Sequence, residues 1–207
     1  MAKVIAIASQ KGGAGKTTLA LALAGEAIAA GKAAVVIDLD PQASAATWAD
    51  HRENDAPIVE AVPYTRLQRS LDEAKQFADL IILDTAPHAE APALAACRAA
   101  DIILIPCRPN FLDVSAIQTT LSMAEMAGKR PVIVFGQVRP NASRQTADAG
   151  TALADASVDI CPHVLSARTD FADSTTVRLT VREHAPGSKA AGEAEAVARW
   201  VFARLGF

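Results

Sequence analysis

Lysine, glycine and threonine residues cluster near the N-terminus, where residues 9–18 read S-Q-K-G-G-A-G-K-T-T. The three glycines permit a tight bend that turns several backbone N–H groups toward one point. In such a loop, Lys16 is placed to reach the β- and γ-phosphates of a nucleotide, and the Thr17 hydroxyl is placed to ligate Mg²⁺. The pattern therefore predicts a polyphosphate site. We expect it to be built from Gly12, Gly13, Ala14, Gly15, Lys16, Thr17 and Thr18.

The flanking sequence indicates which elements position this loop. The apolar run Val4–Ala8 precedes it and predicts a buried strand, and the Ala/Leu-rich run Leu19–Ala30 follows it and predicts a helix. A helix that begins at the loop directs its positive dipole end and its unpaired N–H groups at the phosphates. Strand, glycine loop and helix together predict an α/β nucleotide-binding domain.

Two aspartates follow the next predicted strand. The apolar run Ala34–Ile37 ends in D-L-D-P-Q at residues 38–42. Side chains at positions i and i+2 of an extended segment point the same way, so Asp38 and Asp40 are expected to face one crevice at the strand's carboxyl end. One carboxylate can hold Mg²⁺ through water, and the other can position an attacking water.

A third aspartate, Asp84, ends the run D-L-I-I-L-D at residues 79–84. Four apolar residues followed by aspartate are typical of a Walker B strand, so we expect Asp84 beside Mg²⁺. The loop 85–90 would then sense the γ-phosphate. We interpret His88 in this loop, and His51 in a polar run, as ordinary surface histidines.

Four motifs resemble those of the ParA/MinD family of dimeric ATPases. The form K-G-G-x-G-K-T-T, with Gln10 where other phosphate loops have their first glycine, resembles the family's deviant Walker A box. D-x-D-P-Q resembles its switch I, D-T-A-P at residues 84–87 is a variant of its switch II, and P-x-S-K-A-A-x-E at 186–193 resembles a tail motif of partition ATPases. The resemblance extends from Lys3 to the last helix.

The resemblance implies binding of ATP and Mg²⁺ and a homodimer that forms with ATP. Lys11 would reach across the dimer to the partner's nucleotide. Asp40 would be the aspartate required for hydrolysis, and Asp38 would join Thr17 and Asp84 at the Mg²⁺. In relatives, the loop after the strand at residues 131–136 approaches the adenine, which makes Gln137 and Arg139 candidate contacts.

The family function would be non-specific DNA binding, with hydrolysis that is slow until a centromere-binding, ParB-like protein stimulates it. The location would be cytoplasmic and nucleoid-associated. The candidate DNA contacts are Arg139, Arg144, Arg168, Arg178, Arg182 and Lys189.

Three alternatives remain open at this point. A MinD-like protein would bind membrane through its last helix, Ala190–Leu205, but Glu193, Glu195 and the lack of a lysine cluster favour a helix packed on the sheet. A ParA relative could position a cargo other than DNA. A metabolic or metal-inserting ATPase is the third alternative, although no substrate loop, extra domain or paired cysteine motif supports it. We expect no membrane association.

Composition fits one domain over residues 1–207. Hydrophobic residues make up 51% of the chain and aromatic residues 4%, which predicts a core of Ala, Val, Leu and Ile. The net charge of −3 argues against a globally basic nucleic-acid binder, although residues 129–207 carry ten Lys/Arg against eight Asp/Glu. No signal-peptide layout or bilayer-spanning run is visible. The three cysteines form no C-x-x-C and are interpreted as reduced, buried thiols.

The remaining pattern predicts a mostly parallel, twisted sheet with helices on both faces, as in P-loop NTPases. Further strands are expected at residues 58–62, 101–106, 131–136 and 164–165, and a loop at 168–173. Further helices are expected at residues 42–53, 67–77, 91–100, 114–127 with Asp113 as N-cap, and 143–156.

Overall fold

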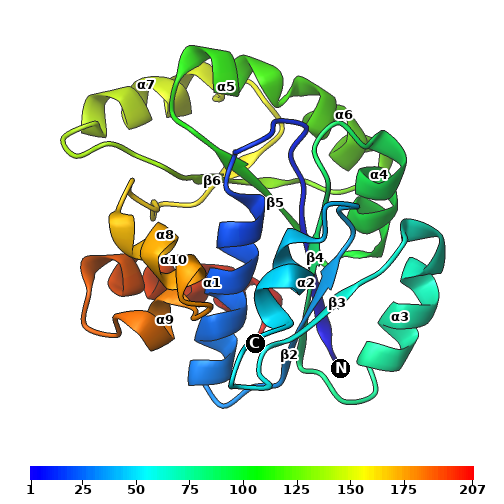
Figure 1. Ribbon diagram of the computed structural model, residues 1–207. Helices are drawn as coiled ribbons and strands as arrows, with labels where there is room; N and C mark the ends of the chain where they lie inside the picture. Colours follow the sequence, from blue (N-terminus) through cyan, green and yellow to red (C-terminus); the bar gives the residue numbers. More distant parts are fainter.

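A seven-stranded sheet runs through the middle of the molecule, which we describe with a computed structural model of residues 1–207 (Figure 1). All its strand pairs are parallel, in the order β3-β2-β4-β1-β5-β6-β7. The strands are β1 Lys3–Ile7, β2 Ala34–Asp38, β3 Ile58–Ala61, β4 Leu80–Asp84, β5 Ile102–Cys107, β6 Val132–Phe135 and β7 Asp159–Ile160. Their apolar runs fit a sheet that is covered on both faces.

Helices cover the two faces of the sheet in separate groups. One core cluster joins the sheet to α1, α2 and α10, and another joins its opposite face to α3–α7. The helices are α1 Lys16–Ala29, α2 Ser44–Ala49, α3 Leu67–Ala74, α4 Glu90–Ala99, α5 Phe111–Ala116, α6 Gln118–Met126, α7 Ser143–Ala152, α8 Thr169–Thr176, α9 Val181–His184 and α10 Lys189–Leu205, with a 3-10 turn at Tyr64–Arg66. The predicted α/β fold is confirmed.

The register of the central strands brings three chain segments to one point. Asp84 at the end of β4 lies opposite Ile7 at the end of β1 and opposite Asp38 at the end of β2. Parallel strands end on the same edge of a sheet, so the loop after β1 and the two aspartates meet there. In Figure 1 this edge is at the top, where the chain leaves β1 and enters α1.

A close approach of the Thr180 side chain to Gly25 docks the start of α9 onto α1. A Cβ atom added at Gly25 would lie 2.8 Å from the Thr180 Cβ, so only glycine lets the two helices meet this closely. Beside this contact, Arg182 binds Glu26 of α1, with nitrogen and oxygen 2.7 Å apart. Thr180 and Glu183 form a reciprocal capping box at the start of α9.

The helix after β5 differs from the prediction of one helix over residues 114–127. It begins at Phe111 and is divided at Ile117 into α5 and α6. Asn110, not Asp113, is the N-cap, because its side chain accepts the Asp113 backbone N–H at 3.0 Å. Asp113 thus lies in the first turn with its carboxylate free to bind a cation.

Two other predicted elements are misplaced, and three helices are shorter than predicted. The seventh strand is Asp159–Ile160 rather than residues 164–165, because residues 159–160 pair with β6. Residues 168–173 fall largely in α8, whose Phe171 packs against the core and favours helix over loop. The helices α2, α3 and α7 end at Ala49, Ala74 and Ala152 instead of residues 53, 77 and 156.

The last helix packs on the sheet with its apolar stripe. Val197, Val201 and Leu205 are buried in one core cluster with α1 and the strands, and Trp200 packs against that cluster. No helix of the protein is both long enough and apolar enough to cross a bilayer. The three cysteines are free and buried, as predicted.

Candidate nucleotide-binding site

The glycine loop after β1 has the backbone geometry of an anion site. Gly13 and Gly15 have φ angles of 69° and 93°, a left-handed conformation that favours glycine. Gly15 immediately precedes α1, and no side chain caps the N-terminus of that helix. The first backbone N–H groups of α1 are therefore available to an anion.

Lys16, in the first turn of α1, is a buried cation without a counterion. It is 7% exposed, forms no ion pair, and its Nζ donates a long hydrogen bond of 3.3 Å to the Lys11 carbonyl oxygen. Burial lowers the pKa of this ammonium, and the nearby Asp84 and Asp40 act in the opposite direction. A buried ammonium with so little compensation is suited to a polyphosphate.

Thr17 and Asp84 form the metal side of the loop. The Thr17 hydroxyl donates to Asp84 Oδ2 at 2.7 Å, while Asp84 Oδ1 is buried without a hydrogen-bond partner. Burial raises the pKa of Asp84 to about 7, and the Thr17 hydrogen bond opposes this rise. The orphaned carboxylate oxygen beside a hydroxyl suits Mg²⁺, which is bound through few protein ligands, several waters and substrate phosphates. No group of three or more His, Cys, Asp or Glu offers an all-protein metal cage.

The two switch I aspartates have different surroundings. Asp38 is buried, and its carboxylate accepts the backbone N–H groups of Asp40, Ala45 and Ala46, which fixes the start of α2 to the sheet. Burial raises the pKa of Asp38, and these hydrogen bonds oppose the rise. Asp40 is half-buried, and its Oδ1 accepts the Gln42 N–H at 2.9 Å. Asp40 is thus the more accessible of the two to a water molecule.

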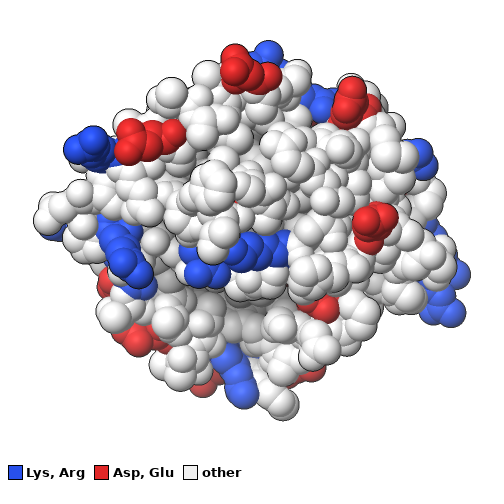
Figure 2. Space-filling view, turned by 90° about the horizontal axis from the view of Figure 1, so that it is seen from above, with Lys and Arg blue, Asp and Glu red and all other residues white.

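The Lys11 side chain binds a carboxylate outside the loop. Its ammonium forms an ion pair with Asp113 of α5, whose carboxylate also has Arg108 Nε at 3.2 Å. Arg108 follows β5 and donates through Nη2 to the Gly13 carbonyl oxygen at 3.1 Å. Figure 2 looks onto the face at the strand ends and shows a band of Lys/Arg atoms near its middle, while further Lys/Arg and most Asp/Glu atoms lie toward its rim.

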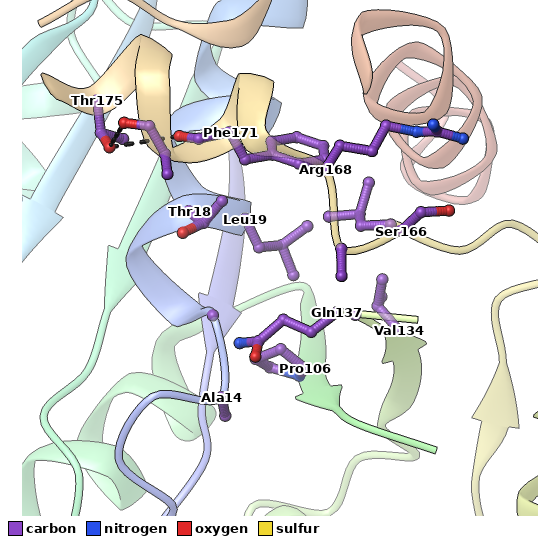
Figure 3. Close-up of a pocket in the computed structure, with 15 residues that line it drawn as sticks. Ala14, Thr18, Leu19, Pro106, Val134, Gln137, Ser166, Arg168, Phe171 and Thr175 are labelled. Atoms are coloured by element: carbon purple, nitrogen blue, oxygen red, sulfur yellow. Dashed lines mark hydrogen bonds between the residues drawn. The ribbon is translucent and has the colours of Figure 1, made fainter. Parts of the chain in front are cut away.

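A cavity of about 340 Å³ adjoins the phosphate loop (Figure 3). Its apolar lining includes Leu19, Pro106, Val134 and Phe171, and in Figure 3 Leu19 lies between Phe171 on one side and Pro106 and Val134 on the other. Gln137 and Thr18 contribute polar side chains to its lining, whereas the Ser166 hydroxyl donates to Glu193. An apolar slot with a few polar groups fits a flat heterocyclic base.

The two predicted base contacts lie in different places. Gln137 lines the cavity and donates through Nε2 to the Gly13 carbonyl oxygen at 2.7 Å. Arg139 is exposed and does not line the cavity. Arg168 lies at the cavity edge, but its guanidinium turns away to Glu193 at 2.6 Å (Figure 3).

Sequence reasoning missed Arg108 and Phe171. Arg108 directly follows a buried strand, and a cation at the carboxyl end of a parallel strand is a usable signal for a ligand site. Phe171 gave no comparable signal, because its place in the cavity depends on how α8 folds back toward β6. The histidines at 51 and 88 are exposed, as predicted.

The candidate DNA contacts divide into paired and free cations. Arg168 is engaged by Glu193, and Arg182 by Glu26 and Glu195. Arg144 faces Asp148 on its own helix at 3.9 Å and is highly exposed. The exposed side chains without an ion pair are Arg139, Arg178 and Lys189.

Comparisons with known proteins agree with this architecture. The CobQ/CobB/MinD/ParA nucleotide-binding domain matches residues 5–180. The maintenance of carboxysome distribution protein A of Gloeobacter kilaueensis is 34% identical over 151 residues, which cover 71% of this chain and 68% of that protein. Protein ParA of Rhizobium radiobacter is 30% identical over 145 residues, covering 66% and 65%.

A solved structure shares the fold at low sequence identity. The septum site-determining protein MinD of Pyrococcus horikoshii, complexed with Mg-ADP, superposes with a TM-score of 0.81 at 16% identity, covering 100% of this chain and 98% of that one. Together with the family match and the 34% identical relative, the site geometry leads to one conclusion. The chain belongs to the CobQ/CobB/MinD/ParA family of nucleotide-binding ATPases.

Proposed function

We propose that the protein is an ATPase that dimerises when it binds ATP and Mg²⁺. As a dimer it binds DNA without sequence preference, and it serves plasmid or chromosome segregation together with a centromere-binding partner protein. The observation that carries this proposal is the position of Lys11. Its ammonium is paired with Asp113 of α5 instead of lying with Lys16 inside the loop, and its side chain is about one-third exposed. A lysine placed there can serve a second subunit.

The proposed roles follow from the site. Lys16 and the amides at the start of α1 hold the phosphates, and the cavity beside Phe171 and Gln137 holds the adenine. Asp40 orients the attacking water. Thr17, with Asp84 beside it, would hold Mg²⁺, which would supply positive charge to neutralise the phosphates. Lys11 of the partner stabilises the charge that develops during phosphoryl transfer, as an arginine finger does.

An exposed apolar pair supports dimerisation through the same face. Phe111 and Leu112 are 82% and 71% exposed at the start of α5, directly before Asp113. Large apolar side chains in such a position are typical of an interface. A dimer formed here would cover both nucleotides and bring each Lys11 to the other subunit.

DNA binding would use the cations that have no carboxylate partner. Arg139, Arg178 and Lys189 are exposed and unpaired, and Arg144 has only a long contact to Asp148. Arg168 and Arg182 are less suited, because glutamates already neutralise them. Phosphate contacts of this kind give binding that is independent of sequence and steeply sensitive to salt.

A second candidate is a ParA-like positioner of a cargo other than DNA, because one relative is named for the distribution of carboxysomes. Its chemistry would be the same, and the partner protein would select the cargo. Membrane binding is less well supported, since the apolar stripe of α10 is packed in the core. Turnover is expected to be slow without the partner, as the resemblance to partner-stimulated ATPases implies.

Sedimentation with plain duplex DNA tests the proposal. The protein is spun with DNA in ATP, in ADP and without nucleotide, at low and at moderate salt. We expect co-sedimentation in ATP alone, weaker at moderate salt. The Arg139→Ala/Arg178→Ala variant should lose it, and the surface control Arg69→Ala on α3 should keep it. Absence of binding in every nucleotide state would refute the DNA role, and liposomes of anionic lipid would then test the membrane alternative.

A further inference from the structure

We propose that Arg108 is a positioning residue that takes over the Asp113 carboxylate when Lys11 leaves it for the partner's nucleotide. The inference rests on the dimerising ATPase proposed above and extends it to a residue with no assigned role. Lys11 cannot serve both its own Asp113 and a second subunit. Arg108 lets it leave, because the carboxylate then keeps a counterion.

The three side chains already form the arrangement this exchange requires. Lys11 Nζ contacts Asp113 Oδ1, and Arg108 Nε lies 3.2 Å from the other oxygen, Oδ2. The Arg108 contact lacks the alignment of a hydrogen bond, so Nε and Oδ2 are buried without a hydrogen-bond partner. A small rotation of the guanidinium would convert this ionic contact into a charge-assisted hydrogen bond. Both cations therefore contact the carboxylate now, and the Arg108 contact remains when Lys11 leaves.

Burial explains why a replacement cation is needed. Asp113 is 4% exposed, whereas the side chains of Lys11 and Arg108 are about one-third exposed. A buried carboxylate that loses its only counterion is strongly destabilised, because neither water nor another charge compensates it. Without Arg108, release of Lys11 would carry this penalty and the ATP-bound dimer would form less readily.

Arg108 is also tied to the phosphate loop. Its Nη2 donates to the Gly13 carbonyl oxygen at 3.1 Å, and Gln137 Nε2 donates to the same oxygen at 2.7 Å. Gln137 lines the cavity that adjoins the loop. The arginine is thereby held at the edge of the nucleotide site, where a change in the loop would alter its distance to Asp113. This contact gives a route from nucleotide binding to the release of Lys11.

A double-mutant cycle tests the inference. Arg108→Gln, Asp113→Asn and the double variant are compared with the unmodified protein in sedimentation equilibrium with Mg²⁺ and a non-hydrolysable ATP analogue. We expect Arg108→Gln to weaken dimerisation at least ~10-fold, because its Asp113 is left unpaired in the dimer. The double variant should recover the affinity of Asp113→Asn, since its position 113 carries no charge. Arg108→Lys should recover part of the loss, and Arg69→Gln is the surface control. Circular dichroism and thermal unfolding of each variant as a nucleotide-free monomer should match the unmodified protein, which checks folding.

Three results of this cycle would overturn the role of Arg108. An Arg108→Gln protein that dimerises as tightly as the unmodified one overturns the role of Arg108 and leaves the dimerising ATPase intact. A double variant that dimerises as weakly as Arg108→Gln also overturns this role, because the arginine would then act on the partner subunit directly. An unmodified protein that stays monomeric with the analogue refutes the proposed function, and the role of Arg108 with it.

Discussion

Asp84→Asn should make the nucleotide-free protein more stable while weakening its binding of Mg-nucleotide. The Asp84 carboxylate is buried at the end of β4 with Oδ1 unpartnered and with two further aspartates nearby. Its negative charge is costly until a cation binds. Asparagine removes the charge and keeps an oxygen that can accept from the Thr17 hydroxyl.

The magnitude follows from the ionisation of this carboxyl. Its pKa is about 7 in the folded protein, against an ordinary value of 3.8. Ionised Asp84 therefore lowers the free energy of unfolding by ~4 kcal/mol above pH 7. The new amide N–H₂ in place of Oδ1 would lack an acceptor, which costs ~1–3 kcal/mol. A net gain of ~1–3 kcal/mol remains at pH 8.

Urea denaturation in EDTA without nucleotide measures this gain. Because the folded pKa is raised, the penalty is absent well below pH 4, grows as pH rises toward 7 and is complete above it. The advantage of Asp84→Asn should accordingly be largest at pH 8 and should vanish or reverse at pH 5. The surface control Asp148→Asn, on exposed α7, should show no such change.

Added Mg-ADP should make the unmodified protein more stable than Asp84→Asn. Ligand stabilises the unmodified protein by mass action, and the variant, which lacks the carboxylate, should gain less. A variant that is less stable than the unmodified protein at pH 8 without ligand would refute the reasoning. It would mean that the Asp84 charge is already compensated in the empty site.

Three further predictions address packing, the base cavity and acid stability. Gly25→Ala should lower the free energy of unfolding in urea by ~1–3 kcal/mol, because its Cβ would meet Thr180 at 2.8 Å, whereas Gly192→Ala on α10 has open space and should be neutral or stabilising. Phe171→Ala should weaken ATP binding ~10-fold in fluorescence titration by removing an aromatic face from the base cavity, and unchanged affinity would place the base elsewhere. Glu193→Gln should destabilise the protein at neutral pH. Burial alone would raise the pKa of Glu193, but its hydrogen bonds and its ion pair with Arg168 lower this pKa below its ordinary value. The difference in free energy of unfolding between the two proteins should be constant above pH 4.5 and should shrink as the pH falls further. A difference that persists in acid would contradict this prediction.

The sheet and the phosphate site follow from local patterns and were predictable. Buried parallel strands are continuous apolar runs, so Val4–Ala8 and the run before Asp84 were identified without tertiary information. Each aspartate ends its strand, and parallel register then brings the aspartates to the glycine loop. These features need only the order of residues along the chain.

The rest depends on contacts between distant segments. Residues 168–173 have no strong helical pattern, and α8 forms where Phe171 can pack on the core. Asp113 has the right residue type for an N-cap, but Asn110 three residues earlier takes that role and leaves Asp113 to bind Lys11 and Arg108. Competition between two capping residues is decided by the loop before the helix, which the sequence pattern does not describe.

Mixing two inactive variants tests most directly whether Lys11 acts across a dimer. Lys11→Ala lacks the lysine, and Asp40→Ala lacks the aspartate that orients water. If Lys11 acts in trans, the mixed dimer holds one complete site, formed by Asp40 of one subunit and Lys11 of the other. The equimolar mixture should then recover up to about a quarter of the unmodified ATPase rate, since half of randomly paired dimers have one working site of two. Phosphate release no higher in the mixture than in either variant alone would contradict the account.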